Sequence, residues 1–184
     1  LLRAVGEPER RFCEDALRIL RLFRFSSVLE FDIEENTLKA ALEYAPTLKR
    51  VSAERIFAEL LKTVCGKNPA ALKPLTDMGG LSFLGIKSRP DYDKIPLLKS
   101  PEIKLFTFLY SGGADAAEAL ELLRAPNKTK KAAKDMLTLL NMPKPETKPE
   151  IKEMLYLTSP VSVENYFDYK AAYGENCENA RNML

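Results

Sequence analysis

Hydrophobic residues recur at helical spacing through most of the chain, and the clearest stretch begins just after Pro8. Its apolar positions lie four, seven, eight and eleven residues beyond Phe12, which is the spacing of one buried stripe on a helix. The pattern predicts one amphipathic helix over residues 9–23, with a proline at its start and acidic residues near its positive end. The stripe is Phe12, Ala16, Ile19, Leu20 and Phe23, and the opposite, charged side carries Arg11, Glu14, Asp15, Arg18 and Arg21.

The same spacing, together with residues that start and stop helices, predicts further helices along the rest of the chain. Their ranges are 34–44, 52–66, 69–78, 101–110, 114–123, 127–140, 150–158 and 161–173, with a brief turn at 81–84. Residues 29–33 alternate apolar and acidic side chains but are too few for a sheet, so we expect an extended connection. Residues 87–99 hold two prolines and mixed charge and are predicted to be a surface loop. The predicted fold class is all-α, with a division near Gly79 and Gly80 or in the loop after them.

Composition excludes several kinds of chemistry. The chain has 184 residues, 28 Lys plus Arg against 26 Asp plus Glu, and 46% hydrophobic residues, which is typical of a globular protein of one or two domains. It has no histidine, so zinc sites that use histidine, Ser-His-Asp triads and His-Asp phosphohydrolase sites are all excluded.

The three cysteines, Cys13, Cys65 and Cys177, are odd in number and far apart, which fits neither a disulfide framework nor a metal cluster. We expect them to be reduced and buried, as in cytosolic proteins. No apolar run approaches about 18 residues and no leader opens the sequence, so a cytoplasmic location without a membrane partner is expected. Because the sequence starts at Leu1 without a methionine, we expect a fragment of a longer protein.

Asp15 and Arg18 form a candidate base-reading pair, because residues three apart on a helix project side by side. Asp only accepts hydrogen bonds and Arg only donates them. Such a pair complements the amino group and ring acceptors of cytosine and adenine, whereas uracil and guanine present the reverse order. The alternative is a solvated ion pair of small energy, which is the more frequent meaning of this spacing taken alone. Glu14 is placed to orient Arg18 or Arg21, and Arg11 to reach Asp15 or a triphosphate; each is otherwise an ordinary surface charge.

Several ordered motifs surround this pair. Residues 2–6 read Leu-Arg-Ala-Val-Gly, the Glu-Asp-x-x-Arg signature of residues 14–18 follows, and Arg24-Phe25 closes the segment. Next come Phe31-Asp32-Ile33, Thr37, the Ser-Ala-Glu-Arg of residues 52–55, and the Leu-Arg-Ala-Pro-Asn-Lys of residues 123–128. Together they resemble the neck and body of class II tRNA nucleotidyltransferases, that is, the CCA-adding enzymes and their bacterial poly(A) polymerase relatives. Ala125 departs from the family, which usually has leucine there.

The resemblance implies a neck domain over residues 1–80 that recognises the nucleotide base, and a body domain over 81–184, with the start of the tail, that binds tRNA. It implies that Asp15 and Arg18, with Glu14 and Arg11 beside them, bind the incoming CTP or ATP. It also implies that the helix beginning at Ser52, Glu54 and Arg55 supports the base-reading helix; otherwise Ser52 caps an ordinary helix and Arg55 is a surface cation.

A cluster of lysines at the start of the predicted helix 127–140 is a second candidate site. Four cations at the positive end of a helix do not stabilise it, so a phosphate-binding role toward the tRNA acceptor arm is consistent, with a solvated surface as the alternative. Asn127 is expected to cap this helix. Asp91 and Asp93 match a metal-binding Asp-x-Asp, but they lie after the neck in a loop flanked by prolines, so we do not expect metal there. The lysines are Lys128, Lys130, Lys131 and Lys134.

The resemblance implies an enzyme that transfers CMP and AMP from CTP and ATP to the 3′ end of tRNA, with Mg²⁺ held by carboxylates of a head domain that precedes this chain. We therefore expect this fragment to contain no catalytic residue and to be inactive alone. The alternatives are a poly(A) polymerase, an enzyme that adds only CC or only A, and a helical RNA-binding module without activity. The sequence predicts no oligomeric state.

Overall fold

The computed structural model describes residues 1–184 and is helical throughout, which confirms the all-α prediction. It contains no strand; a single parallel bridge joins Leu2 to Ile33. The α-helices are α1 Pro8–Glu14, α2 Leu17–Leu29, α3 Glu35–Tyr44, α4 Ala53–Val64, α5 Lys73–Asp77, α6 Pro101–Ser111, α7 Ala116–Leu122, α8 Asn127–Leu140, α9 Lys148–Leu157, α10 Pro160–Ala172 and α11 Glu178–Arg181. The 3₁₀-helices are η1 Ala45–Arg50, η2 Pro69–Leu72, η3 Ser82–Leu84 and η4 Ile95–Leu97.

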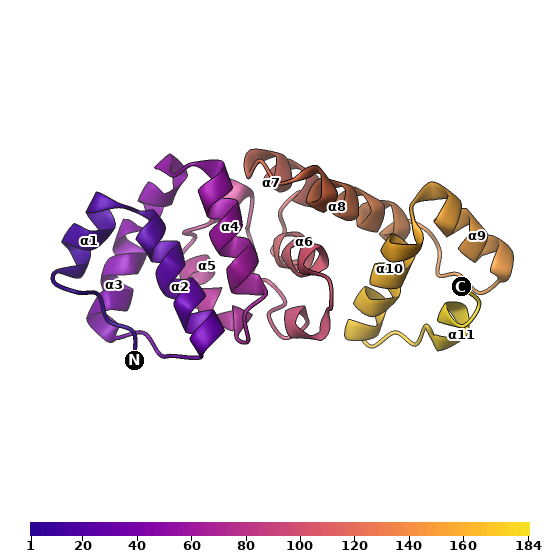
Figure 1. Cartoon of the computed structure of the whole chain (residues 1–184), viewed down its shortest axis with the longest axis horizontal. Helices are drawn as coiled ribbons and strands as arrows, with labels where there is room; N and C mark the ends of the chain where they lie inside the picture. Colours follow the sequence, from indigo (N-terminus) through magenta and orange to yellow (C-terminus); the bar gives the residue numbers. More distant parts are fainter.

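The helices follow one another along a single long axis, from the N-terminal group α1–α5 to the C-terminal group α9–α11 (Figure 1). In the N-terminal group, α2 packs along α4 through side chains that are fully buried, such as Phe23 and Leu60. Where this pair ends, a Cβ atom on Gly66 would lie 2.3 Å from the Ser27 hydroxyl, so only glycine fits. That hydroxyl donates a 2.7 Å hydrogen bond to the carbonyl of Thr63, which fixes the end of α4 against α2.

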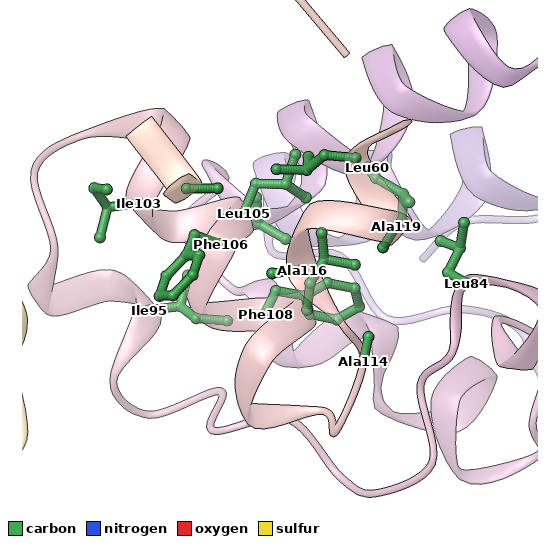
Figure 2. Packing of buried hydrophobic residues seen from close by; sticks show 14 of the residues in the cluster. Leu60, Leu84, Ile95, Ile103, Leu105, Phe106, Phe108, Ala114, Ala116 and Ala119 are labelled. Carbon is green, nitrogen blue, oxygen red and sulfur yellow. The ribbon is translucent and has the colours of Figure 1, made fainter. Parts of the chain in front are cut away.

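Helix α6 connects the two ends of the molecule. It packs against α4 on the N-terminal side and against α7 and α8 on the other, and its residues from Leu105 to Leu109 are all buried. Figure 2 shows Leu105 and Phe108 gathered with Leu60 of α4 and with Ala116 and Ala119 of α7. As a result, the buried apolar side chains form one cluster that extends from α1 to α11.

The first predicted helix is wrong in two respects, because it is two helices that meet at Asp15 and because the second continues to Leu29. Asp15 has an extended backbone (φ −150°, ψ 102°), and its Oδ1 accepts a 3.0 Å hydrogen bond from the backbone N–H of Leu17. The carboxylate thus satisfies one of the free donors at the start of α2. Asp15 and Arg18 therefore do not share one continuous helix: Asp15 lies at the junction, and Arg18 lies in the first turn of α2.

The predicted surface loop 87–99 is also wrong, because three of its four apolar residues are in the core. Tyr92, Ile95 and Leu98 are buried, and the Tyr92 hydroxyl shares a 2.8 Å hydrogen bond with that of Thr76. Burial raises the pKa of Tyr92 to about 12, in spite of that hydrogen bond. Of the charged residues that suggested a loop, Asp93 and Lys94 lie between these buried residues, and the others lie before or after them.

Three smaller predictions also need correction. Asn127 is the first residue of α8 and Pro126 takes the capping position. Ser52 takes the capping position of α4, but its side chain accepts no hydrogen bond there. All three cysteines are free, yet only Cys177 is buried, whereas Cys13 and Cys65 are exposed. None of the helices is both long and apolar enough to cross a membrane.

Candidate functional site

A pocket of about 440 Å³ lies where the N-terminal segment meets the junction of α1 and α2. One carboxylate, that of Asp15, and four arginines line it, so its charge is predominantly positive. Apolar walls come from Phe12, Leu22 and Phe25 among others. The arginines are Arg3, Arg11, Arg18 and Arg21.

Thr37 holds the N-terminal segment in place as one wall of this pocket. The side chain of Thr37 is buried, accepts a 3.2 Å hydrogen bond from the backbone N–H of Ala4, and donates one of 2.6 Å to Glu34. Backbone hydrogen bonds from Leu2 to Asp32 and from Glu34 back to Leu2 complete the attachment. The Phe-x-Ile and Thr motifs therefore have a local structural role: they hold the N-terminal segment that lines the pocket, and of their residues only Thr37 lines the pocket itself.

Asp15 is held in the pocket by two donors. Besides the Leu17 N–H at Oδ1, Oδ2 accepts a 3.0 Å hydrogen bond from the guanidinium of Arg55, which comes from the first turn of α4. Partial burial raises the pKa of Asp15, but the Leu17 hydrogen bond and the Arg55 charge outweigh it and leave the pKa below its ordinary value. Asp15 is therefore ionised near neutral pH and acts only as an acceptor.

Arg18 is oriented by α1. One of its terminal nitrogens, Nη1, donates 2.9 Å to the carbonyl of Arg11 and 2.7 Å to Oε2 of Glu14. The hydrogen bond from Arg18 is the main reason that the pKa of Glu14 is lowered. Glu14 also pairs with Arg10 and Arg11, so one carboxylate gathers three arginines at the end of α1.

Among the pocket side chains that the sequence analysis did not identify as candidates, three bear on ligand binding. Arg3, Arg21 and Phe25 all line the pocket, and the guanidinium of Arg24 lies 4.4 Å from the ring centre of Phe25. The signal for two of them was present: Arg21 and Phe25 follow Arg18 by three and seven residues, which is one face of α2. Arg3 depends on the attachment of the N-terminal segment, which no local pattern reveals.

The lysine cluster lies on α8 and lines no part of the arginine pocket. Lys128 pairs with Glu102 at 2.7 Å, Lys131 pairs with Asp135 at 2.9 Å, and Lys130 pairs with Glu121. Lys134 has no carboxylate within pairing distance and is exposed. Three of the four cations are thus already neutralised in part, which weakens the electrostatic reason for a phosphate site.

Asp91 and Asp93 are both engaged elsewhere. Oδ2 of Asp91 accepts a 2.7 Å hydrogen bond from the hydroxyl of Tyr173, and Asp93 pairs with Lys94. In residues 1–184 no group of three or more Cys, Asp or Glu side chains is arranged to hold a metal ion.

The chain is similar in sequence to known proteins. Residues 30–84 match a family model described as the probable RNA and SrmB-binding site of polymerase A. The CCA-adding enzyme of Streptococcus gordonii is 47% identical over 85 residues, which is 46% of this chain and 21% of that protein. The CCA-adding enzyme of Staphylococcus saprophyticus is 32% identical over 169 residues, which is 85% of this chain and 40% of that protein.

The fold is shared as well. The crystal structure of the Bacillus stearothermophilus CCA-adding enzyme in complex with CTP matches 98% of this chain with a TM-score of 0.79 and 29% identity, and the match covers 49% of that chain. The all-α architecture of this chain is therefore the architecture of part of a CCA-adding enzyme. The chain belongs to the family of CCA-adding enzymes and poly(A) polymerases. It spans about half or less of the length of the relatives it matches.

Proposed function

We propose that this chain is the neck (residues 1–80) and body (81–184) of a CCA-adding tRNA nucleotidyltransferase, and that Asp15 and Arg18 read the base of the incoming CTP or ATP. The observation that carries the proposal is the arginine-lined pocket in which an ionised carboxylate and an oriented guanidinium lie next to each other. The similarity to CCA-adding enzymes over most of the chain supports it.

Base selection follows from the hydrogen-bonding groups that remain free. The carboxylate of Asp15 has room for about four hydrogen bonds and uses two, on Leu17 and Arg55, so it can still accept from an amino group of a base. Arg18 uses only Nη1 for protein contacts, which leaves Nε and Nη2 to donate to ring acceptors. Cytosine and adenine offer an amino group beside an acceptor, and uracil and guanine do not offer it in that order.

The rest of the pocket suits the other parts of a nucleotide. Arg3, Arg11 and Arg21 supply positive charge for a triphosphate, and Phe25 supplies an apolar surface for a base or ribose. Glu14 does not line the pocket, and we propose that it acts indirectly, by holding Arg18 and Arg11.

The chemical step belongs, in this proposal, to a head domain outside residues 1–184. The transfer of a nucleotide needs Mg²⁺ held by carboxylates in line with the reacting oxygens. The residues of this chain do not fit that role, since Asp91 and Asp93 are engaged by Tyr173 and Lys94. We therefore expect the chain alone to bind a nucleotide weakly and to transfer nothing. The lysines of α8 would face the acceptor arm of tRNA.

A poly(A) polymerase is the second candidate, and the match of residues 30–84 to the polymerase A family model favours it. An enzyme of the complete length, given tRNA that lacks its 3′ end together with CTP and ATP, separates the two. A CCA-adding enzyme stops after three nucleotides have been added, and a poly(A) polymerase adds a run of A.

Replacement of the pair in the complete enzyme tests the proposed function. Asp15→Ala and Arg18→Ala should each reduce the preference for CTP and ATP over UTP and GTP by about tenfold or more, in line with the discrimination of a bidentate contact. Competition between the four nucleotides in single-turnover incorporation measures this preference. Arg10→Ala is the matched control, because Arg10 pairs with the same Glu14 but does not line the pocket. Equal selectivity in the two variants and the wild type would contradict the proposal.

A further inference from the structure

The first turn of α4 carries two neighbouring charged residues, Glu54 and Arg55, that form ion pairs with different parts of the chain. Arg55 donates to Asp15, forty residues earlier in the sequence, and Glu54 accepts a 2.9 Å hydrogen bond from Arg124, seventy residues later. Arg124 lies in the turn between α7 and α8. This one helical turn therefore joins the pocket to the part of the chain that carries the lysine cluster.

The backbone N–H groups of Arg55 and Ile56 donate to the carbonyl of Ser52, but few side-chain contacts hold that turn. The side chain of Ser52 accepts no hydrogen bond from it, so the usual cap is missing. Ser52, Glu54 and Arg55 are exposed, and the first fully anchored apolar side chain is Ile56. An uncapped first turn frays easily, so the two ion pairs are the side-chain contacts that fix the position of the Arg55 guanidinium.

Arg124 itself has an uncommon backbone. Its φ of 48° is in the left-handed region, which residues other than glycine and asparagine rarely adopt. The backbone N–H of Arg124 donates to the carbonyl of Glu121, which closes the turn after α7. Glycine would be less strained at this position, but the residue is an arginine, and its side chain reaches Glu54.

We infer that Arg124 is a positioning residue for Asp15: by holding Glu54, it fixes the first turn of α4 so that Arg55 stays on the Asp15 carboxylate. This inference rests on the proposed role of Asp15 in base reading. It means that the turn before α8 contributes to nucleotide selection although it lies outside the pocket. Because an exposed ion pair is weak, we expect an effect of about two- to fivefold on selection.

Substitutions at position 124 separate the ion pair from the shape of the turn. Arg124→Asn removes the charge, and asparagine tolerates a positive φ. Arg124→Lys keeps the charge and should preserve most of the contact. Lys99→Asn is the matched control, since Lys99 is about as exposed as Arg124 and pairs with Asp168 of α10 rather than with a residue of α4.

Titration of the Asp15 carboxyl carbon by NMR in residues 1–184 is the first measurement. Arg55 helps to lower the pKa of Asp15, so Arg124→Asn should raise that pKa toward its ordinary value. Arg124 pairs with Glu54 and not with Asp15, so a rise reports the movement of Arg55. Arg124→Lys and Lys99→Asn should leave the pKa close to that of the wild type. An unchanged pKa in Arg124→Asn overturns the inference.

Nucleotide competition in the complete enzyme is the second measurement. Arg124→Asn should lower the preference for CTP over UTP about two- to fivefold, with Arg124→Lys near the wild type. If Asp15→Ala reduces selection and Arg124→Asn does not, the inference fails and the proposed function stands. If Asp15→Ala has no effect, the proposed function fails, and the NMR titration still decides whether Arg124 positions Arg55.

Discussion

At the residue scale, Asp15 has two structural roles. It ends α1 with an extended backbone, and its carboxylate accepts the Leu17 N–H at the start of α2 while it pairs with Arg55. The sequence alone predicted Asp15 and Arg18 as a base-reading pair; both line the pocket, although Asp15 pairs with Arg55 and Arg18 with Glu14. It could not reveal the break between the helices, since the apolar stripe from Phe12 to Phe23 continues through it without a Pro or Gly.

The lowered pKa of Asp15 predicts how acid affects stability. Because the pKa is lower in the folded chain than in the unfolded chain, the ionised carboxylate stabilises the fold above the unfolded value, and this is lost as pH falls through the folded value. Asp15→Asn keeps an acceptor for Leu17 but loses the pairing with Arg55. Urea unfolding should show the variant less stable than the wild type at pH 6, with a smaller difference at pH 3. A difference that does not depend on pH would contradict this explanation.

At the element scale, the pairing of α2 with α4 includes a buried ion pair. Arg24 of α2 and Glu59 of α4 are only 16% and 9% exposed in their side chains, and their atoms approach to 3.2 Å. Nη1 of Arg24 donates a 3.3 Å hydrogen bond to Oε1 of Glu59, whereas Oε2 has no well-aligned hydrogen bond and contributes through its charge. The sequence predicted both helices from their apolar stripes, but a pair 35 residues apart lies beyond any local pattern.

Removal of one partner of this pair should destabilise the fold more than removal of both. Arg24→Met leaves the Glu59 carboxylate buried and unpaired, at a cost of about 3 kcal/mol in the free energy of unfolding. The double variant Arg24→Met, Glu59→Leu should recover most of that loss. Urea denaturation of the three proteins measures it. A double variant no more stable than Arg24→Met would show that the two side chains act through packing alone.

At the scale of the whole molecule, one continuous core joins the proposed neck and body through α6. The sequence predicted the order and kind of most helices, and α8 begins and ends at the residues expected, because its amphipathic pattern is complete within itself. It misjudged residues 87–99, where the partners lie far along the chain: Asp91 is held by Tyr173, 82 residues away. The short helix α11 was also missed, since four residues hold no recognisable period.

The proposed role of the α8 lysines in RNA binding predicts a salt dependence. Replacement of Lys128, Lys130, Lys131 and Lys134 by Ala should weaken the binding of tRNA and reduce the slope of log affinity against log salt by up to about three, if each lysine meets a phosphate. Glu102→Gln should strengthen binding, because it releases Lys128. Filter binding of tRNA to the complete enzyme at several salt concentrations measures both, with Lys99→Ala as the control. An unaltered slope in the fourfold variant would mean that these lysines only face solvent.

The exposure of Cys13 allows a fluorescent dye to be attached near the pocket without the introduction of a new cysteine. Cys177 is buried. Cys65 is exposed as a residue, but partial desolvation of its thiol raises the pKa of that thiol, so less of it is thiolate near neutral pH. Cys13 is exposed on α1, two residues before Asp15. A maleimide dye at Cys13, in a chain with Cys65 changed to Ser, would stand on α1 next to Phe12, which lines the arginine pocket, and its emission could report the nucleotide binding proposed there.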